Sequence, residues 1–183
     1  MRVITGKARG TRLVTVSGND IVRPTGEKAK EGIFSSIQFV IEGARVLDLF
    51  AGSGQLGIEA LSRGASFVVF IDQNPAATAI VTQNCKACGV FGASRVATMS
   101  AESFLAGSRE QFDLVFLDPP YRGGTLQQLL PAVAQHTVPG GLVLCESEPE
   151  AQLPQQVAGL ALQKQYRYGT VLLTRYRKGD EQA

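Results

Sequence analysis

The residues with the clearest chemical meaning follow one short apolar segment. Residues 112–117 lead directly into Asp118-Pro119-Pro120-Tyr121. Short apolar segments are typical of buried strands, and open α/β sheets bind ligands at the carboxyl ends of their strands. Asp118 can accept a hydrogen bond from an amino group, and the prolines bring no competing N–H, so the carbonyl between them can accept a second one. Tyr121 offers a flat face on which a base can stack. Taken alone, this tetrad also fits a proline turn capped by an Asp. The functional interpretation is that its four residues, Asp118 to Tyr121, are catalytic and act on an exocyclic amine.

A glycine-rich segment upstream indicates a cofactor that contains a nucleoside. Gly52, Gly54 and Gly57 match the G-x-G-x-x-G pattern of dinucleotide sites. Asp48 precedes them at the end of an apolar run, where its carboxylate would repel a pyrophosphate but suits an ammonium group. Asp72 ends the next apolar run and can hold ribose hydroxyls. A ligand with a ribose and a cation but no phosphate is S-adenosylmethionine.

These motifs together resemble a known family. The sequence resembles class I S-adenosylmethionine-dependent methyltransferases that act on amino nitrogens, and specifically the small bacterial 16S rRNA guanine-N2 methyltransferase family (RsmD). The similarity covers nearly the whole chain in order, and its segments are Gly6–Gly10, Arg23–Thr25, Glu31–Phe34, Asp48–Ala60 and Asp118–Tyr121.

The resemblance implies methyl transfer from S-adenosylmethionine to N2 of a guanine in 16S rRNA, with S-adenosylhomocysteine as product and no metal. The substrate it implies is the rRNA within a small-subunit assembly particle. The cofactor-binding residues it implies are Asp48, Phe50, Gly52, Gly54, Gly57, Asp72, Gln73, Ser100 and Ala101. Relatives often carry Asp or Asn where Ser100 stands, and Ser100 is also a good helix cap.

Charge is unevenly distributed along the chain. The formal net charge is +2, but residues 1–30 contain seven basic and two acidic residues. A basic segment joined to a mildly acidic remainder suggests phosphate contacts, although a solvated surface strand has the same composition. The predicted RNA-binding residues are Lys7, Arg9, Arg12 and Arg23.

Length and composition fit one domain with a short extension. The 183 residues are 44% hydrophobic, enough for a single α/β core. We expect a basic N-terminal hairpin extension over 1–22 and the methyltransferase domain over 23–183. No apolar stretch reaches the ~20 residues that span a bilayer, and no signal peptide is recognisable. A cytoplasmic monomer without membrane contact is the expectation.

The hydrophobic pattern alternates strands and helices, which predicts a Rossmann-like, mostly parallel seven-stranded sheet with an antiparallel last strand and helices on both faces. In the extension, strands are expected over 2–5 and 11–16. The further expected strands are 45–49, 67–71, 94–98, 113–117 and 141–145, followed by a terminal hairpin through 160–162 and 168–176. The expected helices are 26–41, 55–63, 75–87, 101–107 and 125–135.

Three alternatives remain open from the residues. The tetrad serves any exocyclic amine, so a DNA adenine-N6 or cytosine-N4 methyltransferase is possible, although the chain has no room for a target-recognition domain. A nicotinamide dehydrogenase would use the glycine motif but leaves the tetrad unexplained. A non-catalytic RNA-binding module would not need Asp118. Cys85 and Cys88 have C-x-x-C spacing but lack further zinc ligands and are expected to be helix thiols, and His136 is expected at a surface or a helix end.

Overall fold

The structure, a computed structural model, describes residues 1–15, 26–120 and 124–180. Its eight-stranded sheet has the order β3-β2-β1-β4-β5-β8-β7-β6. Five strands are parallel neighbours: β1 (Arg45–Leu49), β2 (Phe67–Asp72), β3 (Ser94–Thr98), β4 (Phe112–Leu117) and β5 (Thr137–Ser147). The remaining three are antiparallel to their neighbours: β6 (Gln156–Val157), β7 (Leu160–Tyr168) and β8 (Val171–Lys178). The expected Rossmann-like class I fold is confirmed, with β6 as one strand more than predicted.

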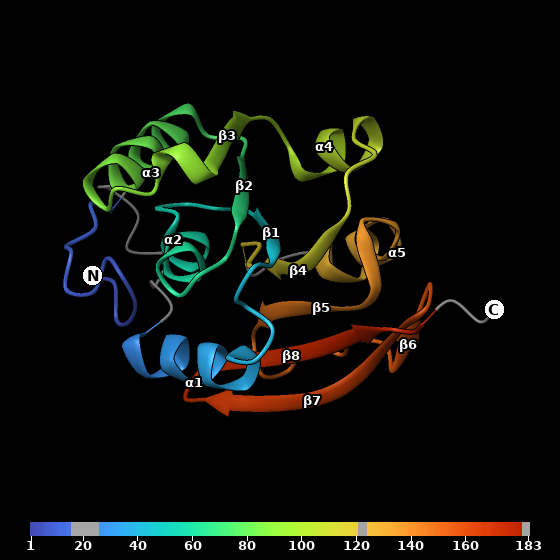
Figure 1. Cartoon of the computed structure of the whole chain (residues 1–183). Coiled ribbons are helices and arrows are strands. Elements are labelled where there is room, and N and C mark those ends of the chain that lie inside the picture. Colours follow the sequence, from blue (N-terminus) through green and yellow to red (C-terminus); the bar gives the residue numbers. More distant parts are fainter. Residues whose placement is uncertain (16–25, 121–123, 181–183) are drawn as a thin grey trace.

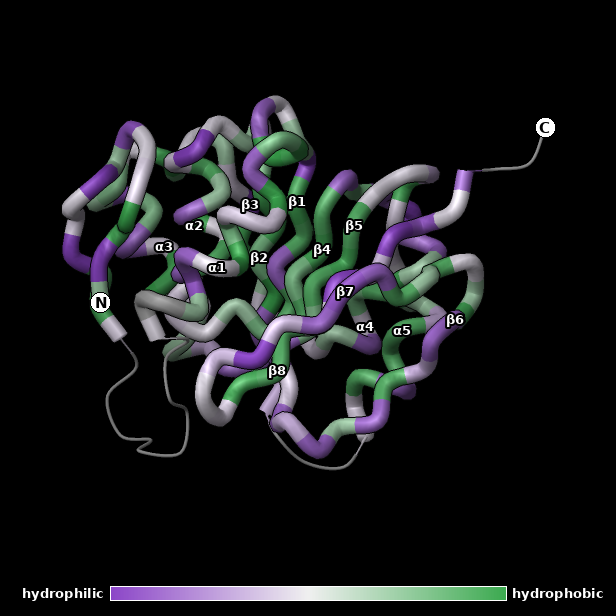
Figure 2. Tube along the Cα trace, turned by 90° about the horizontal axis from the view of Figure 1, so that it is seen from below, coloured by the Kyte–Doolittle hydropathy of each residue, from purple (hydrophilic) through white to green (hydrophobic). Residues whose placement is uncertain are grey.

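Helices cover both faces of this sheet (Figure 1). One face carries α1 (Glu27–Ile37), α2 (Gln55–Ser62) and α3 (Pro75–Ala87), and the other carries α4 (Ala101–Gly107) and α5 (Thr125–Gln135). The central strands β1, β4 and β5 are largely apolar (Figure 2), because a strand covered on both sides must bury both sets of side chains. The chain runs outward from β1 to β3 and then returns to β4, so the strand order reverses between β1 and β4. Ligands of such sheets bind at that reversal.

Helix α1 is shorter than predicted. It ends at Ile37 and not at residue 41, because the apolar periodicity beyond that point does not reflect a buried helical face. Phe39 is 93% exposed. Ile41 is buried through a turn in which the N–H of Val40 bonds to the carbonyl of Ile37.

Strand β5 begins earlier than predicted. Thr137 already pairs with Phe112, and a shift of register then accommodates Pro139-Gly140-Gly141 before Leu142 pairs with Leu114. These three residues therefore form a bulge within the strand, with Gly140 at a positive φ of 76°.

The N-terminal segment does not form the two predicted strands within residues 1–15. One antiparallel bridge joins Arg2 and Arg12. The N–H groups of Ile4 and Thr5 bond to the carboxylate of Glu59 at 2.8 and 2.9 Å, so these donors are not available to a facing strand. The segment also contributes Val3, Ala8 and Leu13 to the core under α2, so described residues 1–15 share the core of the main domain.

No helix in the ranges that the structure describes is both long and apolar enough to cross a membrane.

Candidate active site

Three carboxylates lie on one face of the sheet at the carboxyl ends of β1, β4 and β5. Leu117 pairs with Cys145 across β4 and β5, so the next residues along these parallel strands are Asp118 and Glu146. Because side chains alternate between the faces of a strand, Asp118 and Glu146 point to the face opposite that of Leu117 and Cys145. Asp48 of β1 lies on the same face, two residues after the buried Val46.

The proximity of the other two carboxylates affects the protonation of Asp118. Burial, followed by the negative charges of Glu146 and Asp48, raises the pKa of Asp118 well above its usual range. The Asp118 side chain nevertheless keeps partial exposure, so it lies at the boundary between core and solvent. A carboxyl with a raised pKa takes up a proton readily, which suits a group that must receive one from a substrate amine.

The glycine-rich turn is fixed by two carboxylates. The N–H of Gly52 donates to the Asp72 carboxylate at 2.8 Å, and the N–H of Gly57 donates to the Asp48 carboxylate at 2.9 Å. Phe50 has a φ of +66°, a costly conformation for a residue with a side chain, which redirects the chain from β1 into the turn. Asp48 and Asp72 therefore hold β1, the turn and β2 in one arrangement.

Gly57 is required by packing. A Cβ at this position would lie 2.3 Å from the ring of Phe70, so only glycine lets α2 approach β2 this closely.

Burial dominates the state of Asp48. It raises the pKa of Asp48 from 3.8 to about 8, against the opposing hydrogen bond from Gly57 and with a smaller contribution from the charge of Asp72. The Asp48 carboxylate also occupies the first turn of α2, where a dinucleotide pyrophosphate would otherwise bind. This arrangement disfavours the dehydrogenase alternative.

A first pocket lies beside β2 and the start of α4, with about 620 Å³ of empty space that includes its open mouth. Its lining includes five of the predicted cofactor-binding residues: Phe50, Asp72, Gln73, Ser100 and Ala101. The other four are not part of this lining: Asp48 lies in β1, Gly52 and Gly54 in the turn, and Gly57 in α2. Ser100 also caps α4, since its hydroxyl accepts a bond from the Ser103 N–H at 3.1 Å.

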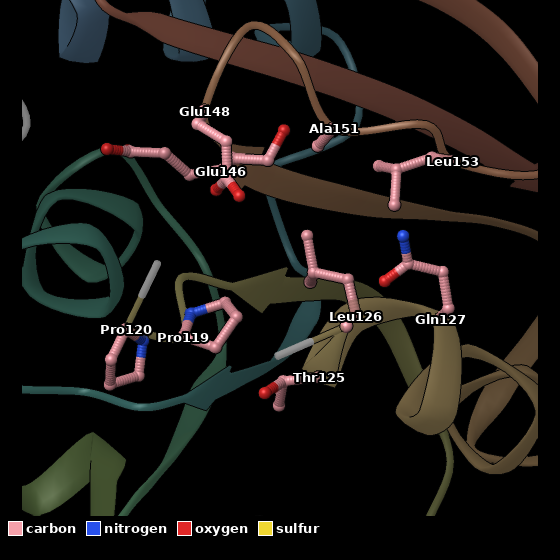
Figure 3. Close-up of a pocket in the computed structure, with 11 residues that line it drawn as sticks. Pro119, Pro120, Thr125, Leu126, Gln127, Glu146, Glu148, Ala151 and Leu153 are labelled. Carbon is pink, nitrogen blue, oxygen red and sulfur yellow. The ribbon is translucent and has the colours of Figure 1, made fainter. Parts of the chain in front are cut away.

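A second pocket lies between the ends of β4 and β5 (Figure 3). Its empty space is about 400 Å³, which includes the open mouth of the pocket. Its lining includes Pro119, Pro120, Gln127, Glu146 and Glu148. Pro120 and Thr125 line both pockets. The two pockets are therefore adjacent and share one wall, which is the arrangement that transfer of a group between two ligands requires.

Two predicted site residues, Tyr121 and Arg23, lie outside the described residues. The other three predicted RNA-binding residues, Lys7, Arg9 and Arg12, are exposed on the N-terminal segment. That segment is docked rigidly on α2: the N–H of Lys7 bonds to the carbonyl of Ser62 at 2.9 Å, and Glu59 holds the chain as described above.

Sequence interpretation missed Glu146. It is 3% exposed, and it follows the apolar run 142–145 as Asp118 follows the run 112–117. The same carboxyl-end rule could have identified it, because the predicted strand ended at residue 145, directly before Glu146. Asn84 of α3 was also missed. Its side chain bonds to the backbone of Val14 and Ser53, and a polar residue in a helix gives no sign of such distant partners.

The cysteine thiols and His136 are packed or hydrogen-bonded within the fold. Burial raises the pKa of Cys85 to about 11, so this thiol is not activated. His136 ends α5, one of the two expected positions, but it is buried rather than on the surface. Its ring nitrogens lie 2.7 and 2.9 Å from the carbonyl oxygens of Glu110 and Leu105, which hold the ring in place. No group of three or more potential metal ligands occurs in the described parts of the chain.

Comparison with known proteins agrees with this geometry. Residues 1–177 match the model of the family described as "Conserved hypothetical protein 95". The chain is 39% identical to "Putative rRNA methyltransferase YlbH" of Bacillus subtilis, over 97% of this chain and 99% of that protein. It is 34% identical to "Ribosomal RNA small subunit methyltransferase D" of Escherichia coli K12, over 97% of this chain and 90% of that protein. The solved structure of "Putative methyltransferase yhhF from Escherichia coli" superposes with a TM-score of 0.86 at 32% identity, covering 99% of both chains.

Proposed function

Because the chain belongs to the RsmD family of class I S-adenosylmethionine-dependent methyltransferases, we propose that it methylates N2 of a guanine in 16S rRNA. Its cofactor is S-adenosylmethionine. The observation that carries the proposal is the wall of Pro120 and Thr125 shared by the two pockets, with Asp118 at the end of the strand beside it. The first pocket takes the cofactor and the second takes the base.

The residues of the first pocket fit the cofactor. Asp72 lines it, and a carboxylate has acceptor positions for ribose hydroxyls beyond its two bonds to backbone N–H groups. Phe50 and Ala101 provide apolar contacts for adenine, and the Ser100 hydroxyl can bond to its amino group. Asp48 would face the methionine ammonium through the turn, where a positive charge would offset the burial that raises its pKa. When bound, the cofactor supplies a methyl group on a sulfonium sulfur, which is reactive toward an amine lone pair.

The residues of the second pocket prepare that amine. The N2 lone pair of guanine is delocalised into the ring, so the free amine is a weak nucleophile. Hydrogen bonds from the NH₂ group to Asp118 and to the Pro119 carbonyl favour a pyramidal nitrogen whose lone pair faces the first pocket. As the C–N bond forms and the S–C bond breaks, the nitrogen becomes positive and releases one proton, for which the raised pKa of Asp118 makes it the acceptor. Tyr121 would stack on the base.

The exposed basic residues provide the contact with RNA phosphates. Lys7, Arg9 and Arg12 lie on a segment held against α2, so their charges are presented from a fixed platform. Arg23 would contact phosphate or the target base closer to the site. Replacing the first three by Ala should reduce the dependence of RNA binding on salt concentration; an unchanged salt slope would contradict their role.

We propose a protein-bearing small-subunit particle as substrate, a monomeric enzyme and the cytoplasm as its location. The small RNA-facing surface of a single domain supports the particle, because a folded particle presents the target base and supplies further contacts.

The decisive experiment uses small-subunit particles from a strain that lacks this protein. Labelled S-adenosylmethionine is added with the wild type or with Asp118→Ala, and the labelled nucleoside is identified by mass. We expect N2-methylguanosine from the wild type and a loss of at least about 100-fold in the variant. Label in adenosine or cytidine would keep the chemistry but overturn the base assignment, and label on DNA alone would favour the DNA methyltransferase alternative.

A further inference from the structure

Glu146 lines the base pocket at the end of β5, next to the strand that ends in Asp118, and the mechanism above does not use it. It is almost fully buried, and its side chain lines the pocket that also contains Pro119 and Pro120 (Figure 3). Glu146 lines the pocket, and Asp118 follows the neighbouring strand at the same level. Carboxylates accept hydrogen bonds and donate none when ionised, so this pair of acceptors complements a ligand that offers several donors side by side.

Among the four RNA bases, guanine fits this requirement best. Its Watson–Crick edge has the N1–H and both N2–H donors next to one another. Adenine and cytosine each place an acceptor ring nitrogen beside the exocyclic amine, and uracil has no amine. In guanine N1 and N2 are bonded to the same carbon, so the acceptors for N1–H and N2–H must be neighbours in the protein, as the positions after Leu117 and Cys145 are.

We propose that Glu146 determines base specificity by accepting the N1–H of the target guanine while Asp118 and the Pro119 carbonyl hold N2. This inference rests on the proposed function. A carboxylate has about four acceptor positions, so other contacts of Glu146 within the protein are compatible with this role. Glu148 also lines the pocket, but it is more exposed and lies beyond the end of β5, away from Asp118.

A base analogue at the target position tests the proposal. The target position is first located in particles, and 16S rRNA is then ligated with a single 2-aminopurine there and assembled in the same way. 2-Aminopurine keeps the exocyclic amine but lacks O6, and its N1 is an acceptor that carries no hydrogen. The loss of O6 is common to all the proteins compared, so the change of preference between variants reports on N1. The ratio of kcat/KM for guanine over 2-aminopurine is measured for each protein, and this ratio is independent of the fraction of protein that is folded.

We expect the wild type to prefer guanine by roughly 10- to 100-fold, the usual effect of one hydrogen bond to a charged group. In Glu146→Gln this preference should be about tenfold smaller than in the wild type, because the amide can donate to N1 of 2-aminopurine. Glu146→Asp, which keeps a carboxylate, should retain a preference. Glu150→Gln removes the same charge from an exposed residue of the turn that follows β5 and should behave as the wild type.

The outcomes separate the inference from the function. A wild type that methylates no guanine overturns both. Methylation of guanine with equal preference in the wild type and Glu146→Gln overturns the role of Glu146 alone. Loss of the preference in Glu148→Gln, with Glu146→Gln unaffected, likewise overturns it.

Discussion

The side chain of Asn84 holds the backbone of Val14 from both sides. Its Oδ1 accepts a bond from the Val14 N–H at 2.9 Å, and its Nδ2 donates to the Val14 carbonyl at 2.9 Å. The same Nδ2 donates to the carbonyl of Ser53 at 2.9 Å. One buried amide of α3 thus joins the basic N-terminal segment to the glycine-rich turn.

We expect Asn84→Asp to weaken cofactor binding without touching the cofactor pocket. A carboxylate cannot donate to the carbonyls of Val14 and Ser53, and each unsatisfied buried group costs about 1–3 kcal/mol. Titration calorimetry with S-adenosylhomocysteine should show a loss of affinity of roughly tenfold or more, with a lower melting temperature. Gln83→Ala, an exposed change on the same helix, is the matched control. Unchanged affinity in Asn84→Asp would show that the turn does not depend on this anchor.

A second prediction concerns the buried pair of Lys30 and Glu59, whose charged groups lie 3.4 Å apart with at most 1% exposure. Glu59 also accepts the N–H groups of Ile4 and Thr5 and the Nε of Arg63. Glu59→Ala removes the carboxylate beside a buried ammonium, and we expect a loss of about 3–5 kcal/mol in the free energy of unfolding, measured with urea.

The double variant Lys30→Met, Glu59→Gln is the control for this pair. It removes both charges and keeps an acceptor for the backbone of the N-terminal segment. It should therefore be more stable than Glu59→Ala. A double variant that is equally unstable would locate the effect in the backbone contacts and not in the ion pair.

The parts of the fold that were predicted correctly from the sequence are those whose ends are marked by residues nearby in the chain. The bounds of α3 and α4 were predicted correctly, because Asn74, Pro75 and Ser100 mark the helix starts chemically. The N-terminal strands were predicted wrongly, because the N–H groups of Ile4 and Thr5 bond to Glu59, which is 54 residues or more away along the chain. No local pattern contains that pairing.

In the candidate site, too, residues marked by local motifs were found from the sequence, and spatial relationships between distant residues were not. Phe50, Asp72 and Ser100 were found because each stands in or next to a motif or at the end of an apolar run, and the structure brings them into one pocket. Their roles in cofactor binding stay predictions. Glu146 could have been found in the same way, since it follows the apolar run 142–145. Its place beside Asp118 emerges only from strand register, which cannot be read from the periodicity of a single strand.

A third prediction tests the close approach of α2 to β2. Gly57→Ala would place a methyl group 2.3 Å from an atom of the Phe70 ring, and overpacking of a core costs about 1–3 kcal/mol. Because the N–H of Gly57 also bonds to Asp48, displacement of α2 should loosen the turn and lower cofactor affinity. Gly107→Ala, where a Cβ meets nothing within 4 Å, should leave the melting temperature nearly unchanged. Equal melting temperatures for the two variants would refute the packing argument.

The final prediction concerns the pH dependence caused by Asp48. Its pKa is raised from 3.8 to about 8 in the folded protein, so the folded state binds the proton more tightly than the unfolded chain. The stability contributed by this group is therefore fully present below pH 3.8 and is lost as pH rises toward 8. Asp48→Asn keeps an oxygen acceptor for the Gly57 N–H but has no charge to bury. Its stability relative to the wild type should accordingly increase between pH 4 and 8 and level off above that, as followed by urea unfolding at a series of pH values. Cofactor affinity should fall in the same variant, because the methionine ammonium loses its carboxylate. A stability difference that does not vary with pH would mean that Asp48 remains ionised throughout, and unchanged cofactor affinity would remove Asp48 from the binding site.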